Sequence, residues 1–419
     1  MSELSIRRDN LFNKMKENSA MVLFAGVPKI CSEDETFPFS VNRNFFYLTN
    51  IKQENSVLLL IKGVGERKVY LFIDEYNELK EKWTGRRITF EEATSVSKID
   101  NVFSTSSFEN MLALALSKEN NQYGAIDTLY LDLSPELKIK DSYSTLNFEE
   151  FIHLEYPYIV TTNAYPIIRD LRAVKSSVEV ENLVNAINLT NGGLSQVILD
   201  MKPGLLEKNL ADIFEFYGRN HGCYRLAFPT ICAGGKNATC LHYPQQKDAV
   251  RDNTLVLFDL GFTHEGYCAD ISRTYPVNGK FEGVQKEIYE AVLNCNKAVI
   301  EYVRSGMLLK ELQEFATEFL RKECIARGLM KEDEDIRKYY YHNVSHFLGL
   351  DTHDVGDREK PLEDGNIITV EPGLYFAQHN CGVRIEDDVL IRDGRGECLS
   401  KNIAKEIDDI ERIFQTKGR

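Results

Sequence analysis

The chain has 419 residues, 43% hydrophobic and 27% charged, enough material for two or three globular domains. Its 50 basic and 64 acidic residues give a formal charge of −14, which argues against nucleic acid as a partner. No apolar run approaches the ~20 residues of a membrane-spanning helix, and residues 1–15 lack the apolar core of a signal peptide. We therefore expect a cytoplasmic protein without a membrane partner.

Nine cysteines are scattered along the chain, and none forms a Cys-x-x-Cys pair. Such spacing favours reduced thiols over a disulfide framework or a thiolate zinc centre.

The first ~165 residues alternate short β-branched or aromatic runs with amphipathic segments, which predicts an α/β amino-terminal domain. The predicted strands are Phe45–Thr49, Val57–Ile61, Val69–Ile73 and Leu129–Leu133, and the predicted helices include Leu4–Met15 and Phe108–Leu116.

A new pattern begins at Ser176, where Ser176 and Glu179 form a capping box that predicts a long helix from Ser177. Further helices are predicted at Glu207–Asn220, Val284–Arg304 and Leu309–Arg327. No flexible linker separates the two halves, so the change of pattern itself marks the boundary.

Two predicted hairpins each carry an acidic residue on both arms. If residues 255–272 fold back about His264 and Glu265, Asp259 lies opposite Asp270. Directly opposed carboxylates repel each other, so a shared proton or divalent cations must neutralise them. The alternative is a hairpin whose acids face water, but an acid within an otherwise apolar run favours burial.

The second hairpin repeats this arrangement, because a fold-back about Gln378 and His379 brings Glu371 and Glu386 together. Arg384 lies two residues before Glu386, hence on the same face of the strand. It could orient a carboxylate of the site or form an ordinary surface ion pair.

Three of the eight histidines, His342, His346 and His353, fall within twelve residues. A lone histidine is usually structural, but this cluster favours a site. Oxygen ligands with one imidazole suit a site for Mn²⁺, Co²⁺, Fe²⁺ or Zn²⁺. They do not suit a structural zinc centre, whose ligands are thiolates. Two such ions bridged by carboxylates would generate a hydroxide at neutral pH, which predicts hydrolytic chemistry.

The five motifs together resemble the pita-bread metallopeptidases of family M24, and among them most closely the aminopeptidase P group. In chain order they are Asp259-Leu-Gly, Asp270-Ile-Ser-Arg-Thr, Ser345-His346-Phe-Leu-Gly-Leu-Asp-Thr-His353-Asp, Val-Glu371-Pro-Gly and Arg384-Ile-Glu386-Asp-Asp. The resemblance implies an α+β fold, with an amino-terminal α/β creatinase-type domain at residues 1–168 and a pita-bread (creatinase/aminopeptidase-like) catalytic domain at residues 169–419.

The resemblance also implies roles for individual residues. Two divalent metal ions, with Mn²⁺ as first choice, would be held by Asp259, Asp270, His346, Glu371 and Glu386. Glu371 would act as the general base, His353 would stabilise the tetrahedral intermediate, and His242 would bind substrate or polarise its carbonyl. His342, Tyr375 and Arg384 match positions that line the pocket.

The segment around Asp34 and the segment around Trp83 also look like that family. In relatives the latter reaches a neighbouring subunit's site, which implies a homodimer or homotetramer. Ordinary packing is the alternative for Trp83.

The implied activity is cleavage of the bond between a first residue and a proline in peptide substrates. A prolidase, which cleaves Xaa-Pro dipeptides, is the nearest alternative because it shares all five ligands. A metal-independent creatinase-like amidinohydrolase or a non-catalytic binding protein of the same fold should have lost ligands, and here the set is complete.

Overall fold

The computed structural model describes residues 2–118, 122–133, 143–223 and 225–416. Its contacts divide the chain into two units, Met1–Arg172 and Ala173–Arg419. The predicted boundary between residues 168 and 169 falls inside a helix, α8 (Tyr165–Ala173), and stays a prediction.

The amino-terminal unit is built on a six-stranded mixed sheet in the order β4-β3-β2-β1-β5-β6. Its strands are β1 (Ser19–Phe24), β2 (Val57–Gly63), β3 (Glu66–Ile73), β4 (Val102–Ser104), β5 (Thr128–Leu131) and β6 (Val160–Asn163). Among its described residues, the unit also contains the helices α1 (Glu3–Lys14), α2 (Arg43–Thr49), α3 (Glu78–Thr84), α4 (Phe90–Ser97), α5 (Phe108–Leu116) and α7 (Tyr143–Glu155), with a 3₁₀ turn, η1, at Thr105–Ser107.

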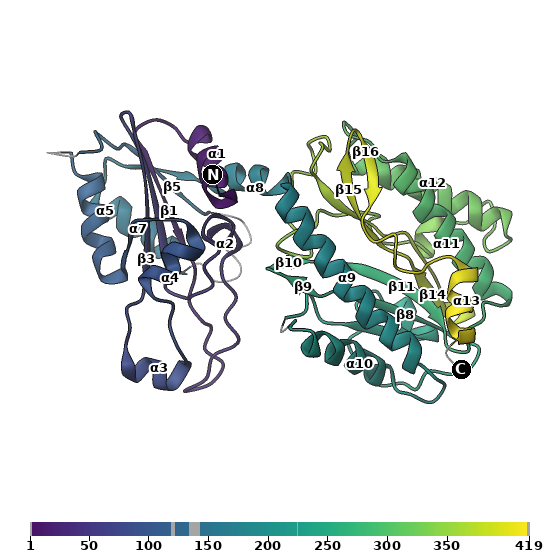
Figure 1. The fold of residues 1–419 in the computed structure, drawn as a ribbon. Helices are drawn as coiled ribbons and strands as arrows, with labels where there is room; N and C mark the ends of the chain where they lie inside the picture. Colours follow the sequence, from purple (N-terminus) through teal and green to yellow (C-terminus); the bar gives the residue numbers. More distant parts are fainter. Residues whose placement is uncertain (1, 119–121, 134–142, 224, 417–419) are drawn as a thin grey trace. The chain divides into compact units, whose positions relative to one another are not determined.

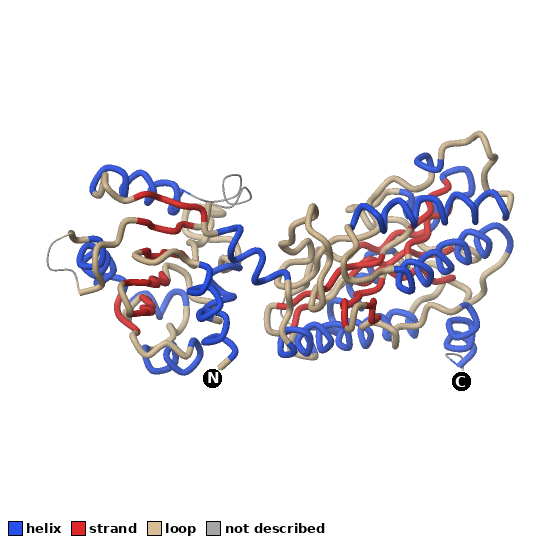
Figure 2. The backbone as a smooth tube through the Cα atoms, turned by 90° about the horizontal axis from the view of Figure 1, so that it is seen from above, coloured by secondary structure: helices blue, strands red, loops and turns tan. Residues whose placement is uncertain are grey.

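Both faces of this sheet are covered. Helices α5 and α7 lie on one face, α1 and α2 on the other (Figures 1 and 2). Strand β2 is buried at every position, as expected for a strand between two helical layers. The predicted α/β character of this domain is confirmed.

The strand predicted at Phe45–Thr49 is wrong, because these residues lie in α2. The side chain of Asn42 caps the helix by accepting from the Phe45 N–H, and Asn50 ends it in the left-handed conformation. Nearly all of α2 is buried, so it shows no polar face. A short apolar run with that property has no periodicity that separates helix from strand.

The carboxy-terminal unit contains several short antiparallel sheets between two pairs of helices. Helices α9 (Ser177–Asp200) and α10 (Glu207–Asn220) cover one face, and α11 (Gly283–Tyr302) and α12 (Leu309–Ala326) cover the other (Figures 1 and 2). The predicted capping box is present at Ser176 and Glu179. The unit ends with α13 (Ile407–Thr416).

The strands of this unit form four sheets: β11-β8-β7, β12-β15-β16, β13-β14 and β10-β9. Their bounds are β7 (Ile231–Gly234), β8 (Leu255–Leu260), β9 (Thr263–His264), β10 (Tyr267–Cys268), β11 (Ile271–Pro276), β12 (Ile367–Val370), β13 (Gly373–Phe376), β14 (Cys381–Arg384), β15 (Asp387–Arg392) and β16 (Arg395–Cys398). Short 3₁₀ segments are η2 (Gly235–Thr239), η3 (Ile336–Lys338) and η4 (Ala377–His379).

Candidate metal centre

The first acidic hairpin pairs β8 with β11 in a register that places Asp259 opposite Ser272. The prediction that Asp259 lies opposite Asp270 is therefore wrong by two residues. The turn is centred on Glu265 and Gly266, which both have positive φ, as a two-residue hairpin turn requires. Because side chains alternate between faces with a period of two, a shift of two residues leaves both aspartates facing the same way.

The second acidic hairpin has the predicted register. Strands β12 and β15 pair Val370 with Asp387, and β13 and β14 pair Gly373 with Arg384, which is the fold-back about Gln378 and His379. Glu371 and Glu386 lie between these two ladders, at the point where regular pairing is interrupted.

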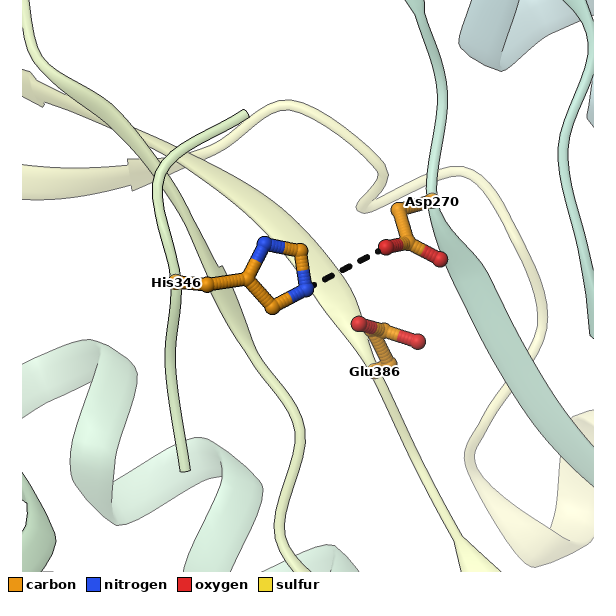
Figure 3. Close-up of side chains that lie close together, drawn as sticks. All are labelled: Asp270, His346 and Glu386. Carbon is orange, nitrogen blue, oxygen red and sulfur yellow. Dashed lines mark ion pairs between the residues drawn. The ribbon is translucent and has the colours of Figure 1, made fainter. Parts of the chain in front are cut away.

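Three of the predicted ligands, Asp270, His346 and Glu386, are buried and offer ligand atoms within 4.8 Å of one another (Figure 3). His346 Nε2 lies 3.3 Å from Asp270 Oδ2 and 3.5 Å from Glu371 Oε1. The structure thus brings residues from both hairpins and from the histidine segment to one point.

The backbone sets the orientation of the His346 ring. Its Nδ1 lies 3.0 Å from the Phe347 carbonyl oxygen, which can only accept, so Nδ1 carries a proton and Nε2 is the ring nitrogen whose lone pair can bind a metal. That lone pair faces carboxylate oxygens. A cation among these atoms would relieve the repulsion between them.

The carboxylates are buried close together, and their pKa values are raised as a result. Burial and the nearby Asp259 raise the pKa of Asp270, and burial and Asp270 raise that of Glu386. Burial raises the pKa of Glu371 to about 7, although His346 and Arg384 oppose the shift. A divalent cation bound among these carboxylates would favour their charged forms.

Each hairpin supports an acid of the other. Arg384, on the second hairpin, donates to Asp259 Oδ2 at 2.5 Å, while Ser272, on the first, donates to Glu386 Oε2 at 2.7 Å. Arg384 Nε also donates to Ser272 Oγ at 2.7 Å. Among the described residues, Asp259 Oδ1 is buried without a hydrogen-bond partner. An unpaired buried carboxylate oxygen fits a metal ligand.

A second chain of hydrogen bonds leads from Arg384 to His342. Arg384 Nη1 donates to Tyr375 Oη at 3.0 Å, and that hydroxyl donates to His342 Nε2 at 2.8 Å, because His342 Nδ1 donates to the Asn343 carbonyl. Burial and then Arg384 lower the pKa of His342 to about 3, so the ring is neutral. These three predicted pocket residues form one connected network.

The remaining predicted residues lie at the edge of the centre or outside it. The ring of His353 packs edge-to-face on His346, with centroids 4.4 Å apart. Its pKa is lowered by partial burial, by His346 and by His242, which is itself exposed. Asp34 and Trp83 belong to the amino-terminal unit, where both are exposed, Trp83 by 80%.

Sequence reasoning missed two features that position these residues. Ser272 stands two residues after Asp270, so strand alternation alone could have placed it on the same face. The Lys175–Asp354 ion pair, 3.1 Å long with both side chains 1% exposed, anchors the residue that follows His353. Lys175 carries no sequence signal for this contact because its partner is remote along the chain.

This geometry is that of a candidate metal site made of buried carboxylates and one imidazole, and comparisons with known proteins place the chain in a family of metallopeptidases. The model of metallopeptidase family M24 matches residues 181–393, and the model of the aminopeptidase P amino-terminal domain matches residues 5–123. The chain belongs to metallopeptidase family M24. The predicted pita-bread fold with its creatinase-type amino-terminal domain is confirmed.

Similar proteins cover nearly the whole chain. A Xaa-Pro aminopeptidase from Haemophilus influenzae is 32% identical over 98% of this chain and 97% of its own length. A structure of aminopeptidase P from E. coli with the inhibitor Pro-Leu is 29% identical, with a TM-score of 0.90 over 100% of this chain and 99% of that one. A Zn-substituted E. coli aminopeptidase P in complex with product has the same identity, TM-score and coverage.

Among the residues that the structure describes, no helix is both long and apolar enough to cross a lipid bilayer.

Proposed function

We propose that this protein is a metal-dependent Xaa-Pro aminopeptidase, which hydrolyses the bond between the first residue of a peptide and a proline in second position. The strongest support is the cluster of possible metal-ligand atoms from Asp270, His346 and Glu386. This cluster occurs in a chain that aligns along 98% of its length with a Xaa-Pro aminopeptidase. Proline's tertiary amide and missing N–H distinguish this bond from those cut by general aminopeptidases. The prolidase alternative is not favoured.

Asp259, Asp270, His346, Glu371 and Glu386 would hold two divalent ions, with Mn²⁺ as the proposed metal. When bound, such ions lower the pKa of water and polarise a carbonyl. Oxygen donors with a single imidazole support this choice of metal over a thiolate-type zinc centre.

The chain's own residues have separate tasks in this proposal. Glu371 takes the proton of the attacking water, since its carboxylate lies at the partly exposed edge of the centre, with Oε1 3.5 Å from His346 Nε2. His353 and His242 hold the carbonyl oxygen of the substrate. Arg384, Tyr375 and His342 line the pocket, and Arg384, which also donates to Tyr375, holds Asp259 in place.

We further propose a homo-oligomer in which Asp34 and Trp83 contribute to a neighbouring subunit's site. Helix α3 has no buried residue, and its two large apolar side chains, Leu79 and Trp83, are 68% and 80% exposed, which supports the proposal. The free state of all nine cysteines supports a reducing, cytoplasmic location. We retain residues 1–168 and 169–419 as the proposed domain limits.

The test is to remove the metal by exhaustive chelation, verify the loss by elemental analysis, and assay Xaa-Pro-Yaa-Zaa and Xaa-Pro peptides before and after Mn²⁺ is added. We expect no cleavage without metal and restored release of the first residue with it. Full activity after verified demetallation would refute the proposal. Cleavage of the dipeptide alone would instead favour a prolidase.

A further inference from the structure

The two glutamates of the metal centre lie where the second hairpin lacks a regular hydrogen-bond ladder. Ile385 donates its N–H to the Pro372 carbonyl, but Pro372 has no N–H to donate in return. The Ile385 carbonyl, directly before Glu386, therefore lacks its partner on the opposite strand. Buried carbonyl groups are almost always paired, so another donor is required.

Asn296, from helix α11, supplies that donor. Its Nδ2 donates to the Ile385 carbonyl at 3.2 Å and to the Val370 carbonyl at 3.1 Å. These two carbonyls belong to the peptide units that lead into Glu386 and Glu371. One fully buried amide thus holds both glutamate-bearing strands at the interruption.

The orientation of this amide is determined by its neighbours. Lys405 Nζ, which can only donate, lies 2.8 Å from Asn296 Oδ1, so the Asn296 nitrogen must face the two carbonyls. Lys405 also donates to Asp387 Oδ2 at 2.6 Å. Asp387 Oδ1 accepts from Arg273 at 2.7 Å, and Arg273 donates in turn to the Glu386 carbonyl at 2.5 Å.

We propose that Asn296 is a positioning residue that sets the spacing of Glu371 and Glu386 for metal binding, and that Lys405 holds Asn296 in its working orientation. This inference rests on the proposed dinuclear metal function. Neither residue touches the ligand side chains, so both act through the backbone of the glutamates.

The test compares Mn²⁺ binding isotherms and the electron paramagnetic resonance spectrum of the Mn²⁺ pair in the full-length wild type and in N296D and K405M. Asp keeps the shape of Asn and still accepts from Lys405, but an ionised carboxylate cannot donate to the carbonyls. We expect N296D to bind Mn²⁺ about 10- to 100-fold more weakly. Spin coupling between the ions should be altered, and kcat should fall with little change in KM.

K405M provides an independent arm, because the Lys405 side chain is 15% exposed and its loss is tolerated more easily than a buried change. We expect K405M to weaken Mn²⁺ binding in the same direction as N296D but by a smaller factor. K405R keeps a cationic donor at this position, so we expect it to bind Mn²⁺ as the wild type does. If N296D does not fold, the Mn²⁺ binding of K405M and K405R tests the proposal in its place.

Cys295→Ala is the matched control, since Cys295 is the buried neighbour of Asn296 in α11 and contacts α12 through the Ala316 carbonyl. It should lower thermal stability and leave Mn²⁺ binding unchanged. A folded N296D or K405M with the wild-type isotherm and spectrum would overturn the inference, as would equal weakening in C295A. Failure of the proposed function would appear separately, as a wild type that binds two Mn²⁺ without cleaving Xaa-Pro peptides.

Discussion

The two acidic hairpins of the carboxy-terminal unit end in different turns. The first turns through Glu265 and Gly266, both with positive φ, and the second through the four residues from Ala377 to Asn380, of which Asn380 has positive φ. The first register differs by two residues from the one predicted, and the second agrees with it. Because strand side chains repeat every two residues, both registers keep the acids on the face of the candidate metal centre.

The hairpins also differ in what their acids do. The first contributes Asp259, held by Arg384, and Asp270. The second contributes Glu371, whose side chain is the more exposed of its two glutamates, and Glu386, held by Ser272. In the proposed function the first hairpin would serve metal binding, whereas the second would combine metal binding with proton transfer.

Replacing Glu371 by Gln should have the largest effect, because it removes the group proposed to transfer the proton in the second hairpin. A glutamine cannot accept the proton of the attacking water, so we expect kcat to fall by about 10²- to 10⁴-fold while the fold is retained. The measurement is kcat on an Xaa-Pro-Yaa peptide, with circular dichroism and metal content determined in parallel. Glu359→Gln, at an exposed position, is the control and should keep full activity. An unchanged kcat in E371Q would remove Glu371 from the role of base.

Replacing Ser272 by Ala tests whether the first hairpin supports an acid of the second. The variant removes the donor to Glu386 and the acceptor for Arg384, and we expect metal affinity to fall about 10-fold. Titration with Mn²⁺ would measure it. Thr190→Val, which removes a buried hydroxyl hydrogen-bonded within α9 and to the Phe262 N–H, should lose stability without losing metal affinity. Equal affinities for wild type and S272A would show that this support is dispensable.

The protonation of Glu371, on the second hairpin, should make metal binding depend on pH. Burial raises the pKa of Glu371 to about 7 in the metal-free protein, above the ~4.3 of an unfolded chain. Below pH 7 this group therefore carries a proton that metal binding must release, and the raised pKa values of Asp270 and Glu386 act in the same direction, so metal affinity should rise as the pH increases through 7. Calorimetry at pH 6 in buffers of different ionisation enthalpy counts the protons released.

The E371Q variant is the internal control for this count, because glutamine has no proton to release. We expect it to release about one proton fewer than the wild type at pH 6. The same shift predicts that the metal-free wild type gains stability as pH falls from 7 towards 4.5, since the folded state then binds a proton that the unfolded chain lacks. Identical proton counts in the two proteins would contradict the raised pKa of Glu371.

The turns themselves should give the smallest effect. Gly266 has φ of +89°, and an alanine there should lower the free energy of unfolding by about 1–2 kcal/mol. Asn380→Gly keeps a residue that accepts positive φ, so its effect should stay within about 0.5 kcal/mol. Urea unfolding of both variants measures this. A neutral G266A would mean that the first hairpin does not depend on its turn residue.

Local sequence predicted much of the carboxy-terminal unit. The capping box at Ser176, the bounds of α10 and the register of the second hairpin all depend on neighbouring residues, and all are confirmed. The register of the first hairpin was mispredicted, although Gly266 already marks its turn. The prediction of a strand at α2 is wrong because this helix is buried on nearly all sides, so its sequence has no alternation of exposed and buried positions that would indicate a helix.

The amino-acid sequence by itself identified the candidate metal ligands and the strand faces on which they lie, because the alternation of side chains along a strand is local. Only the tertiary structure decided which groups hold them there. Arg384 meets Asp259, Lys175 meets Asp354, and Asn296 and Lys405 meet the strands of Glu371 and Glu386 across long stretches of chain. Such contacts arise from packing between elements remote in sequence, and no local pattern encodes them.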